Sequence, residues 1–350
     1  MNSFSTSTHF KNWIKTEEQL EKIVGLKIQK IYKRIKEVNS LIHKENEEKS
    51  HHMTEEQNTN FEKYISEKKF FLKAEDEKLF IISYTDKFIK ILNNQSDKST
   101  SLKNTATSYF RRFYLKKSII DYDPLFVMAA CFFLGSKINS LHYTQNDLFK
   151  IFHVSKESWE KLKEYEFYLC TILDYDFYVY NPYQALLGFI YTLDKKEFFI
   201  SQDKQNYINQ DDFKNDCMSI IDKMYLTDNI FLYTYSEIAL ASIIIQCEYK
   251  NINIHNIAEK LELDKIIDVK EFIEKQVTDM KKRIHIIPKY ENNAEEDEKI
   301  NKIYGSVKAF LKKFPKYQAQ LDKERDILKN KMKDFDNIFN QFAPPTKENK

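Results

Sequence analysis

The sequence predicts an all-helical (all-α) protein that contains two tandem copies of one helical unit. Only 4 of its 350 residues are glycine and 6 are proline, too few for hairpin-rich β folds or for α/β folds with glycine-lined phosphate loops. Leu102–Lys137 aligns without a gap on Phe213–Glu248, which lies 111 positions later. Both segments place apolar residues at the spacing of one helix face, so we expect a repeat of helices.

A helical segment is expected before the first copy, over residues 1–43. Phe10–Ile42 has apolar residues at helical spacing, and Thr16–Gln19 has the sequence of a capping box. Residues 44–72 are assigned to a polar linker, because their first part has almost no apolar side chains. The pair His51-His52 has no further ligand residues beside it, so no metal site is expected there.

The first helical unit is predicted over residues 73–178 and the second over residues 179–290. The helices expected in the first unit are Ala74–Asn93, two within Leu102–Lys137, Thr144–Phe152 and Ser155–Leu173. Those expected in the second are Pro182–Leu193, Asp211–Leu226, Ser236–Tyr249, Ile254–Leu261 and Lys265–Ile287. Asp123 and Pro124 fit the first positions of a helix, and the capping box Thr234–Glu237 stands at the same place in the second copy.

Residues 291–350 are expected to form charged C-terminal helices and a tail. An apolar stripe at helical spacing runs from Ile300 to Phe314, and a more polar helix is predicted over Gln318–Phe342. Ala343–Lys350 is expected to lack ordered structure.

The charge composition gives no reason to expect a nucleic acid or a membrane as a partner. The formal charge is +2, from 55 basic and 53 acidic residues. The basic clusters Arg111-Arg112, Lys116-Lys117 and Lys281–Arg283 are expected to lie on solvated helix faces. The longest apolar run, Leu125–Gly135, is too short to span a bilayer, and no signal peptide is visible. An intracellular soluble protein is therefore expected.

Sequence motifs for catalysis are absent. The patterns GxGxxG, GxxxxGK(S/T), HExxH, GxSxG and CxxC do not occur. The four cysteines, Cys131, Cys170, Cys217 and Cys247, lie in apolar helical stretches and are expected to be buried reduced thiols. We therefore expect no enzyme, no cofactor and no metal site.

Several segments resemble the cyclin family. The similar segments are YFRRFYL at Tyr109–Leu115, Asp123-Pro124, AACFFLGSK at Ala129–Lys137, the crossing Leu173–Tyr183 into a second box, and Leu226–Leu240. Within the family the sequence is most similar to cyclin H, with cyclin C next. The resemblance covers about Thr8–Tyr290 and implies two tandem five-helix cyclin-box repeats flanked by N- and C-terminal helices.

The resemblance implies a regulatory subunit that binds and activates a cyclin-dependent kinase. By this resemblance, the two residues that cyclins use against the kinase backbone match Lys137 and Glu166. These residue types suit the task, because a lysine can donate to carbonyls and a carboxylate can accept from amides. Ile138 and Cys170 are neighbouring candidates for kinase contact. Lys137 aligns with Glu248 of the second copy. We therefore expect the first copy to contact the kinase. We expect the second copy to lack the lysine–carboxylate feature and to have a supporting role.

The resemblance also implies a place in the CDK-activating kinase of TFIIH, a RING-finger assembly factor as a further subunit, and links to transcription and the cell cycle. Localisation in the nucleus is expected, with the cytoplasm as a second location. Family members have acidic residues shortly after the lysine, whereas Lys137 is followed by Ile-Asn-Ser. The alternatives are a cyclin C-like Mediator kinase subunit, a TFIIB-like factor that binds DNA, and a scaffold that activates no kinase.

Overall fold

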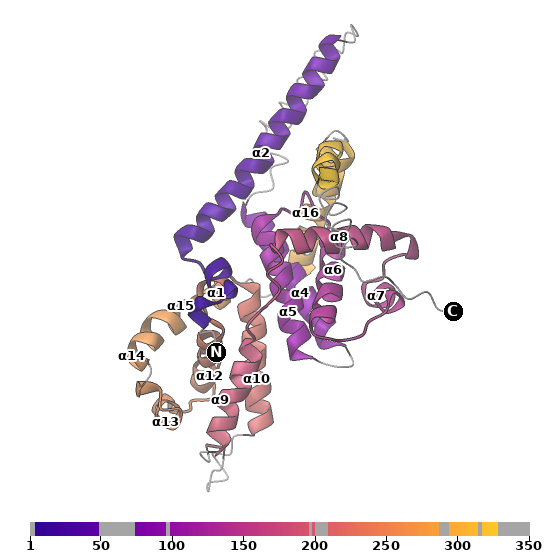
Figure 1. The fold of residues 1–350 in the computed structure, drawn as a ribbon. Helices are drawn as coiled ribbons and strands as arrows, with labels where there is room; N and C mark the ends of the chain where they lie inside the picture. Colours follow the sequence, from indigo (N-terminus) through magenta and orange to yellow (C-terminus); the bar gives the residue numbers. More distant parts are fainter. Residues whose placement is uncertain are drawn as a thin grey trace, which may run out of the picture. The chain divides into compact units, whose positions relative to one another are not determined.

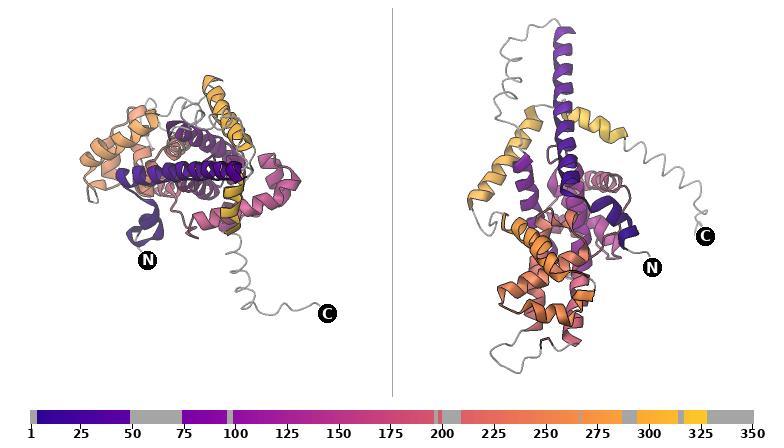
Figure 2. Two further views of the ribbon diagram at one scale, coloured as in Figure 1. Left: turned by 90° about the horizontal axis from the view of Figure 1, so that it is seen from above. Right: turned by 90° about the vertical axis from the view of Figure 1, so that its left-hand side faces the viewer.

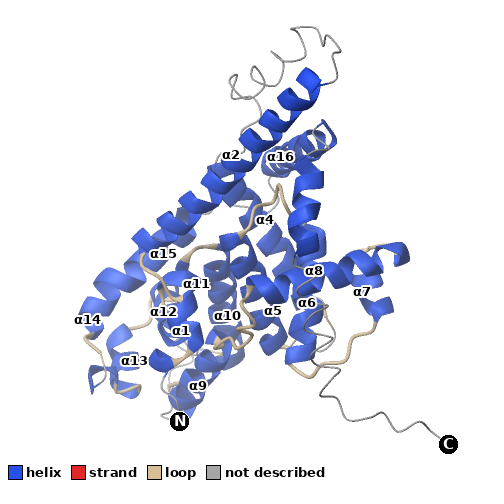
Figure 3. Ribbon diagram, turned by 45° about the horizontal axis from the view of Figure 1, so that its top comes forward, coloured by secondary structure: helices blue, strands red, loops and turns tan. Residues whose placement is uncertain are grey.

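A computed structural model describes residues 4–48, 74–95, 99–195, 198–199, 209–265, 267–286, 294–313 and 317–327. All regular elements in these ranges are helices, which Figure 3 draws in blue. The predicted all-α class is confirmed for the part of the chain that the structure describes.

The chain divides into two compact units. The first joins Met1–Gly25 with Ala74–Asn301, and the second joins Leu26–Lys73 with Lys302–Lys350. Both helical repeats belong to the first unit, so contacts between the repeats can be described within it.

The N-terminal segment forms two helices where one was expected over Phe10–Ile42. Helix α1 covers Thr8–Trp13 and helix α2 covers Glu17–Glu48. The break has a local cause: the Thr16 amide donates to Gln19 Oε1 (3.1 Å), and the Gln19 amide donates to Thr16 Oγ1 (3.3 Å). This predicted capping box starts a new helix at Glu17.

Helix α2 also ends later than predicted. It continues through Glu48, so residues 44–48 are helical, whereas the polar linker was expected to begin at residue 44. These residues are lysine, glutamate and asparagine, and lysine and glutamate favour a helix even without apolar neighbours. The rest of the expected linker, including His51-His52, lies outside the described residues.

The first repeat contains the five expected helices. They are α4 (Ala74–Asn93), α5 (Thr100–Lys116), α6 (Pro124–Ile138), α7 (Gln145–Phe152) and α8 (Trp159–Ile172). Helix α5 is central, because it packs against α4, α6 and α8 (Figure 1) and buries every residue from Leu102 to Leu115. Asp123 caps α6 by accepting from the Leu125 amide at 2.9 Å, as predicted.

Gly135 allows α5 and α6 to approach closely. A Cβ atom at this position would lie 3.3 Å from Leu102 Cδ1 and 3.4 Å from the Ala106 Cβ. Gly135→Val should therefore lower the free energy of unfolding by about 2 kcal/mol, because its branched side chain would have to push α5 away. Gly188→Val is the matched control, since a Cβ there meets no heavy atom within 4 Å. Urea denaturation of both variants checks this, and equal stability of the two would contradict the close approach.

Within the described residues, the second repeat has five main helices and two shorter ones of four and three residues. Its helices are α9 (Pro182–Lys195), α10 (Gln210–Leu226), α11 (Asn229–Leu232), α12 (Tyr235–Tyr249), α13 (Ile254–Lys260), α14 (Val269–Glu271) and α15 (Thr278–Ile286). The capping box of Thr234 and Glu237 starts α12 as predicted. Figure 2 shows the orange helices of residues 254–286 gathered together in both views.

The last helix of the second repeat differs from the expected Lys265–Ile287. It starts at Val269, because the Asp268 carboxylate caps it by accepting from the Glu271 amide at 3.0 Å. A π-helical turn, η5 (Phe272–Val277), joins α14 to α15. Residue 287 lies outside the described residues.

The terminal helices meet in the second unit. Helix α16 covers Ala294–Lys313, and residues 317–327 are helical. Arg34 of α2 donates from Nη2 to Glu324 Oε2 (2.9 Å) and from Nη1 to the Tyr317 hydroxyl (3.2 Å). The remainder of the predicted helix Gln318–Phe342 and the tail Ala343–Lys350 lie outside the described residues.

Candidate functional site

The structure brings Lys137 and Glu166 together. Lys137 Nζ in the last turn of α6 lies 2.6 Å from Glu166 Oε1 on α8. The Lys137 ammonium also lies 3.9 Å from the centre of the Phe133 ring, a cation–π contact from the preceding turn. The lysine side chain is 49% exposed and the glutamate side chain 16%, so the pair lies at the surface with its acid partly covered.

Local structure fixes the end of α6 that carries Lys137. The Asn139 side chain donates to the Gly135 carbonyl at 2.8 Å and to Thr105 Oγ1 at 3.1 Å, which ties the C-terminus of α6 to α5. The chain then turns at Ser140, which has a φ of 56°. A lysine in the last turn is also favoured by the helix dipole.

Ile138 and Cys170 lie beside this ion pair and differ in exposure. Ile138 is 45% exposed, an unusual position for a large apolar side chain in the last turn of a packed helix. Cys170 is half-buried, and burial, followed by the negative charge of Glu166, raises the pKa of its thiol to about 11. The thiol is therefore neutral at physiological pH and contributes apolar contact area rather than reactivity.

The pair retains hydrogen-bonding capacity for a partner. A lysine ammonium has three donors and a carboxylate about four acceptor positions, so one mutual bond leaves several of each. The surface can therefore donate to carbonyls and accept from amides at neighbouring points. Among the described residues, no group of three or more His, Cys, Asp or Glu side chains is placed to hold a metal ion.

The second copy carries an ion pair at the matching place, contrary to the expectation that the feature is absent there. Glu248, which aligns with Lys137, accepts a hydrogen bond from Lys281 of α15. Tyr249, 53% exposed, follows Glu248 as Ile138 follows Lys137. The sequence comparison considered only Lys137 and Glu248, whereas Lys281, the partner of Glu248, comes from another helix. The two copies thus present ion pairs of opposite polarity.

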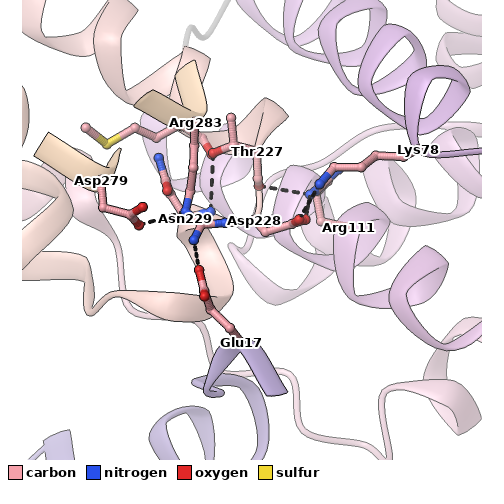
Figure 4. Close-up of polar contacts among 9 residues, drawn as sticks. Glu17, Lys78, Arg111, Thr227, Asp228, Asn229, Asp279 and Arg283 are labelled. Carbon is pink, nitrogen blue, oxygen red and sulfur yellow. Dashed lines mark hydrogen bonds and ion pairs between the residues drawn. The ribbon is translucent and has the colours of Figure 1, made fainter. Parts of the chain in front are cut away.

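Arg111 and Arg112 are buried, so the expectation that they lie on a solvated helix face is wrong. The reason is that α5 is surrounded on all sides, so even its basic residues face protein. Arg111 Nη2 donates to the Thr227 carbonyl at 2.9 Å and to Asp228 Oδ1 at 3.0 Å (Figure 4). These two acceptors belong to the second repeat, so Arg111 joins the repeats.

Asp228 receives a second cation from the first repeat. Lys78 Nζ of α4 lies 2.8 Å from Asp228 Oδ2, on the same side of the carboxylate as Arg111 in Figure 4. Burial raises the pKa of Asp228, but the charges of Arg111 and Lys78 and their hydrogen bonds more than offset it and lower the pKa below its ordinary value. The carboxylate is ionised at neutral pH and holds α4 and α5 to the second repeat.

Asp176, in the crossing between the repeats, anchors α1 and was not identified from the sequence. It accepts from Thr8 Oγ1 at 2.7 Å and from Trp13 Nε1 at 3.0 Å. The Arg112 guanidinium lies 4.5 Å from the centre of the Trp13 ring. The Lys15 amide donates to the Phe231 carbonyl at 2.7 Å, so the N-terminal segment contacts both repeats.

His9 gives this docked segment a pH dependence. Its Nδ1 accepts from the Tyr180 amide at 3.0 Å, and burial, followed by the charge of Arg112, lowers its pKa to about 3. An unfolded histidine has a pKa of about 6.5, so below that pH the unfolded state binds a proton that the folded state excludes. Stability should therefore fall by about 2 kcal/mol between about pH 7 and pH 5 through this group.

The variant His9→Asn should flatten that part of the pH profile, because asparagine keeps an acceptor and does not titrate. His142→Asn is the control, since it makes the same substitution at an exposed histidine. Urea denaturation at the two pH values measures both. An identical slope for His9→Asn and the unmodified chain would contradict the burial of a neutral imidazole.

The remaining sequence expectations concern the cysteines and the membrane. All four cysteines are free thiols; Cys131, Cys217 and Cys247 are buried, as predicted, and Cys170 is only partly so. None of the described helices is long and apolar enough to cross a membrane.

Comparison with known proteins identifies similar sequences. A model of the cyclin C-terminal domain matches residues 181–278. The cyclin mcs2 of Schizosaccharomyces pombe is 29% identical over 187 residues, 53% of either chain. The cyclin CCL1 of Saccharomyces cerevisiae is 28% identical over 243 residues, 69% of this chain and 57% of that one. The chain thus spans about half the length of the curated relatives it matches.

Two solved structures share the fold. One is a chain of the CAK complex of Chaetomium thermophilum bound to ATP-gamma-S, with a TM-score of 0.61, 18% identity, and coverage of 87% of this chain and 88% of that one. The other is a chain of the yeast TFIIK (Kin28/Ccl1/Tfb3) complex, with a TM-score of 0.56, 20% identity, and coverage of 80% and 100%.

Proposed function

We propose that this chain, which belongs to the cyclin family and is similar to cyclin H, binds a cyclin-dependent kinase as its regulatory subunit and activates it. The observation that carries the proposal is the surface ion pair of Lys137 and Glu166 on the first repeat. It lies where the resemblance to cyclins places the kinase contact, and it offers donors and acceptors side by side with the exposed Ile138.

The pair would act on the kinase backbone. Lys137 would donate to carbonyl groups at the end of a kinase helix, and Glu166 would accept from amides or basic side chains nearby. Ile138, together with the half-buried Cys170, would supply apolar contact area. Holding that kinase helix inward completes the lysine–glutamate ion pair that orients the ATP phosphates, so the chain would activate without chemistry of its own.

The similar proteins support a role in transcription. The similar chain of Saccharomyces cerevisiae is named cyclin CCL1, and the two structures that share the fold are those of CAK and TFIIK complexes. We therefore place this chain in a CDK-activating kinase of the TFIIH type, in the nucleus, with a RING-finger assembly factor as a third subunit. The yeast TFIIK complex likewise has three named components.

The alternatives make different predictions. A cyclin C-like subunit would co-purify with a Mediator-type kinase, and a relative of that kind, the cyclin-C of Rattus norvegicus, is 27% identical over 157 residues. A TFIIB-like factor needs free basic side chains for DNA, whereas Arg111 and Arg112 are buried against protein groups.

The test is reconstitution of the full chain with the cyclin-dependent kinase that co-purifies with it. The chain should bind the kinase and raise its rate of peptide phosphorylation by at least about tenfold. Absence of binding would reject the proposal. Binding without stimulation would support the scaffold alternative, and salt-sensitive DNA binding by the chain would support the TFIIB-like one.

A further inference from the structure

The second repeat has a groove beside its ion pair. The groove has a volume of about 1350 Å³, and Glu248 is one of the residues that line it. Its apolar lining consists mainly of partly exposed branched side chains: Ile252, Ile254, Ile267, Val269 and Ile273. It forms where α12 ends, α13 begins and the chain reaches the π-helical turn.

Glu248 is unfavourable for the helix that carries it. It lies in the last turn of α12, where the helix dipole favours a cation such as Lys137 in the first repeat and disfavours an anion. Its ion pair with Lys281 offsets this cost. Because both side chains are about one-third exposed, the carboxylate still presents acceptor positions to the groove.

The lining of the groove favours a helical occupant. Strand addition needs an open sheet edge, and the described residues form helices throughout. Polyproline segments bind grooves lined by Phe, Tyr or Trp rings, whereas none of these rings lines this groove, whose apolar lining is isoleucine, valine and one alanine. An amphipathic helix binds with its apolar face in such a groove.

The polarity of the ion pair indicates the direction of that helix. The first four amides of a helix lack partners within it and carry a partial positive charge, whereas the last four carbonyls carry a partial negative charge. A carboxylate therefore fits a helix N-terminus, just as an ammonium fits a C-terminus. The other charged residues that line the groove are two of each sign, Lys265, Lys270, Asp268 and Glu274, so Glu248 leaves the lining with one net negative charge. Glu248 stands at the position that matches Lys137, so the second repeat is suited to the opposite end of a helix.

We propose that the groove of the second repeat binds an amphipathic helix of another protein, with the N-terminal end of that helix at Glu248. The apolar stripe of the helix contacts the isoleucines, and its first turn has no acidic residue. This surface is separate from the kinase contact proposed for the first repeat. The second repeat thus has a binding role, beyond the supporting role expected from the sequence.

The test is selection from a displayed library of amphipathic helical peptides of about 15 residues, with their first turn randomised, against the full chain. Enriched peptides should lack Asp and Glu in the first turn. Their affinity should fall at least about tenfold for the double variant Glu248→Lys/Lys281→Glu, which keeps the ion pair and reverses its polarity. Ile254→Lys should weaken binding similarly, and thermal unfolding shows whether that variant is folded.

The double variant Lys137→Glu/Glu166→Lys is the matched control, because it makes the same exchange in the first repeat. It should leave peptide affinity unchanged while it impairs kinase binding, so the two proposals fail separately. The proposal is overturned if no peptide is enriched, or if enriched peptides bind the second-repeat variants as tightly as the unmodified chain. It is also overturned if the chain dimerises through this groove and Glu248→Lys/Lys281→Glu separates the dimer.

Discussion

Lys137→Ala/Glu166→Ala should weaken kinase binding by about 100-fold or more and reduce kinase activation accordingly. Each side chain would make charge-assisted hydrogen bonds to the kinase, worth about 1.5–3 kcal/mol apiece, and both would be lost together. The measurement is the dissociation constant of the full chain for the kinase, together with the phosphorylation rate at saturating chain.

The fold should not change in this variant. Lys137 is half-exposed, and surface ion pairs contribute only about 0–1 kcal/mol to stability, so the midpoint of thermal unfolding should shift little. Glu160→Ala/Lys163→Ala is the matched control, because that pair also lies on α8 at 2.7 Å and is exposed. Equal kinase affinity for both double variants would reject the site assignment while leaving cyclin function open.

Helix positions could be predicted where the signal is local. Helix α4 has the predicted bounds Ala74–Asn93, because the apolar spacing begins and ends within a few residues of polar sequence. Asp123 and Thr234 start their helices as predicted, because an N-cap depends only on the next three residues. The break before Glu17 had the same kind of signal, since a capping box at Thr16 starts a helix and cannot lie within one.

Pairing between distant residues could not be predicted. Arg111 and Asp228 lie 117 positions apart, and an arginine next to another arginine on a helix gives no indication of its partner. The burial of Arg111 follows from the central position of α5, which is a property of the whole bundle. Lys281 could not be identified as the partner of Glu248 for the same reason, because the two residues lie 33 positions apart on different helices.

The candidate site was predicted as a set of residues and not as a geometry. The resemblance selected Lys137 and Glu166, and the structure places their charged atoms 2.6 Å apart. The groove of the second repeat had no sequence signal, because it depends on the π-helical turn after Glu271 and on the late start of α14. A continuous helix over Lys265–Ile287, as the sequence predicted, would have a different surface.

Asp228→Ala should lower the free energy of unfolding by about 3 kcal/mol, because it leaves the Arg111 guanidinium buried without its counter-ion. Arg111 is 5% exposed, so water cannot replace the lost carboxylate. Arg111→Met should cost a similar amount, and the double variant Arg111→Met/Asp228→Ala should cost clearly less than the sum, with a coupling of about 2 kcal/mol. Urea denaturation of the unmodified chain, the two single variants and the double variant gives the four free energies of unfolding of this double-mutant cycle.

Lys78→Met provides the comparison within the same network, because Lys78 contacts the same carboxylate at 2.8 Å from an exposed position. It should cost less than about 1 kcal/mol. The pH dependence adds an independent check: the folded pKa of Asp228 is lowered, so its contribution is complete above the unfolded value of about 3.9 and is lost as the pH falls through the folded value. Additive costs in the cycle, or an Asp228→Ala chain with unchanged acid sensitivity, would show that the repeats are joined by apolar packing and not by this ion pair.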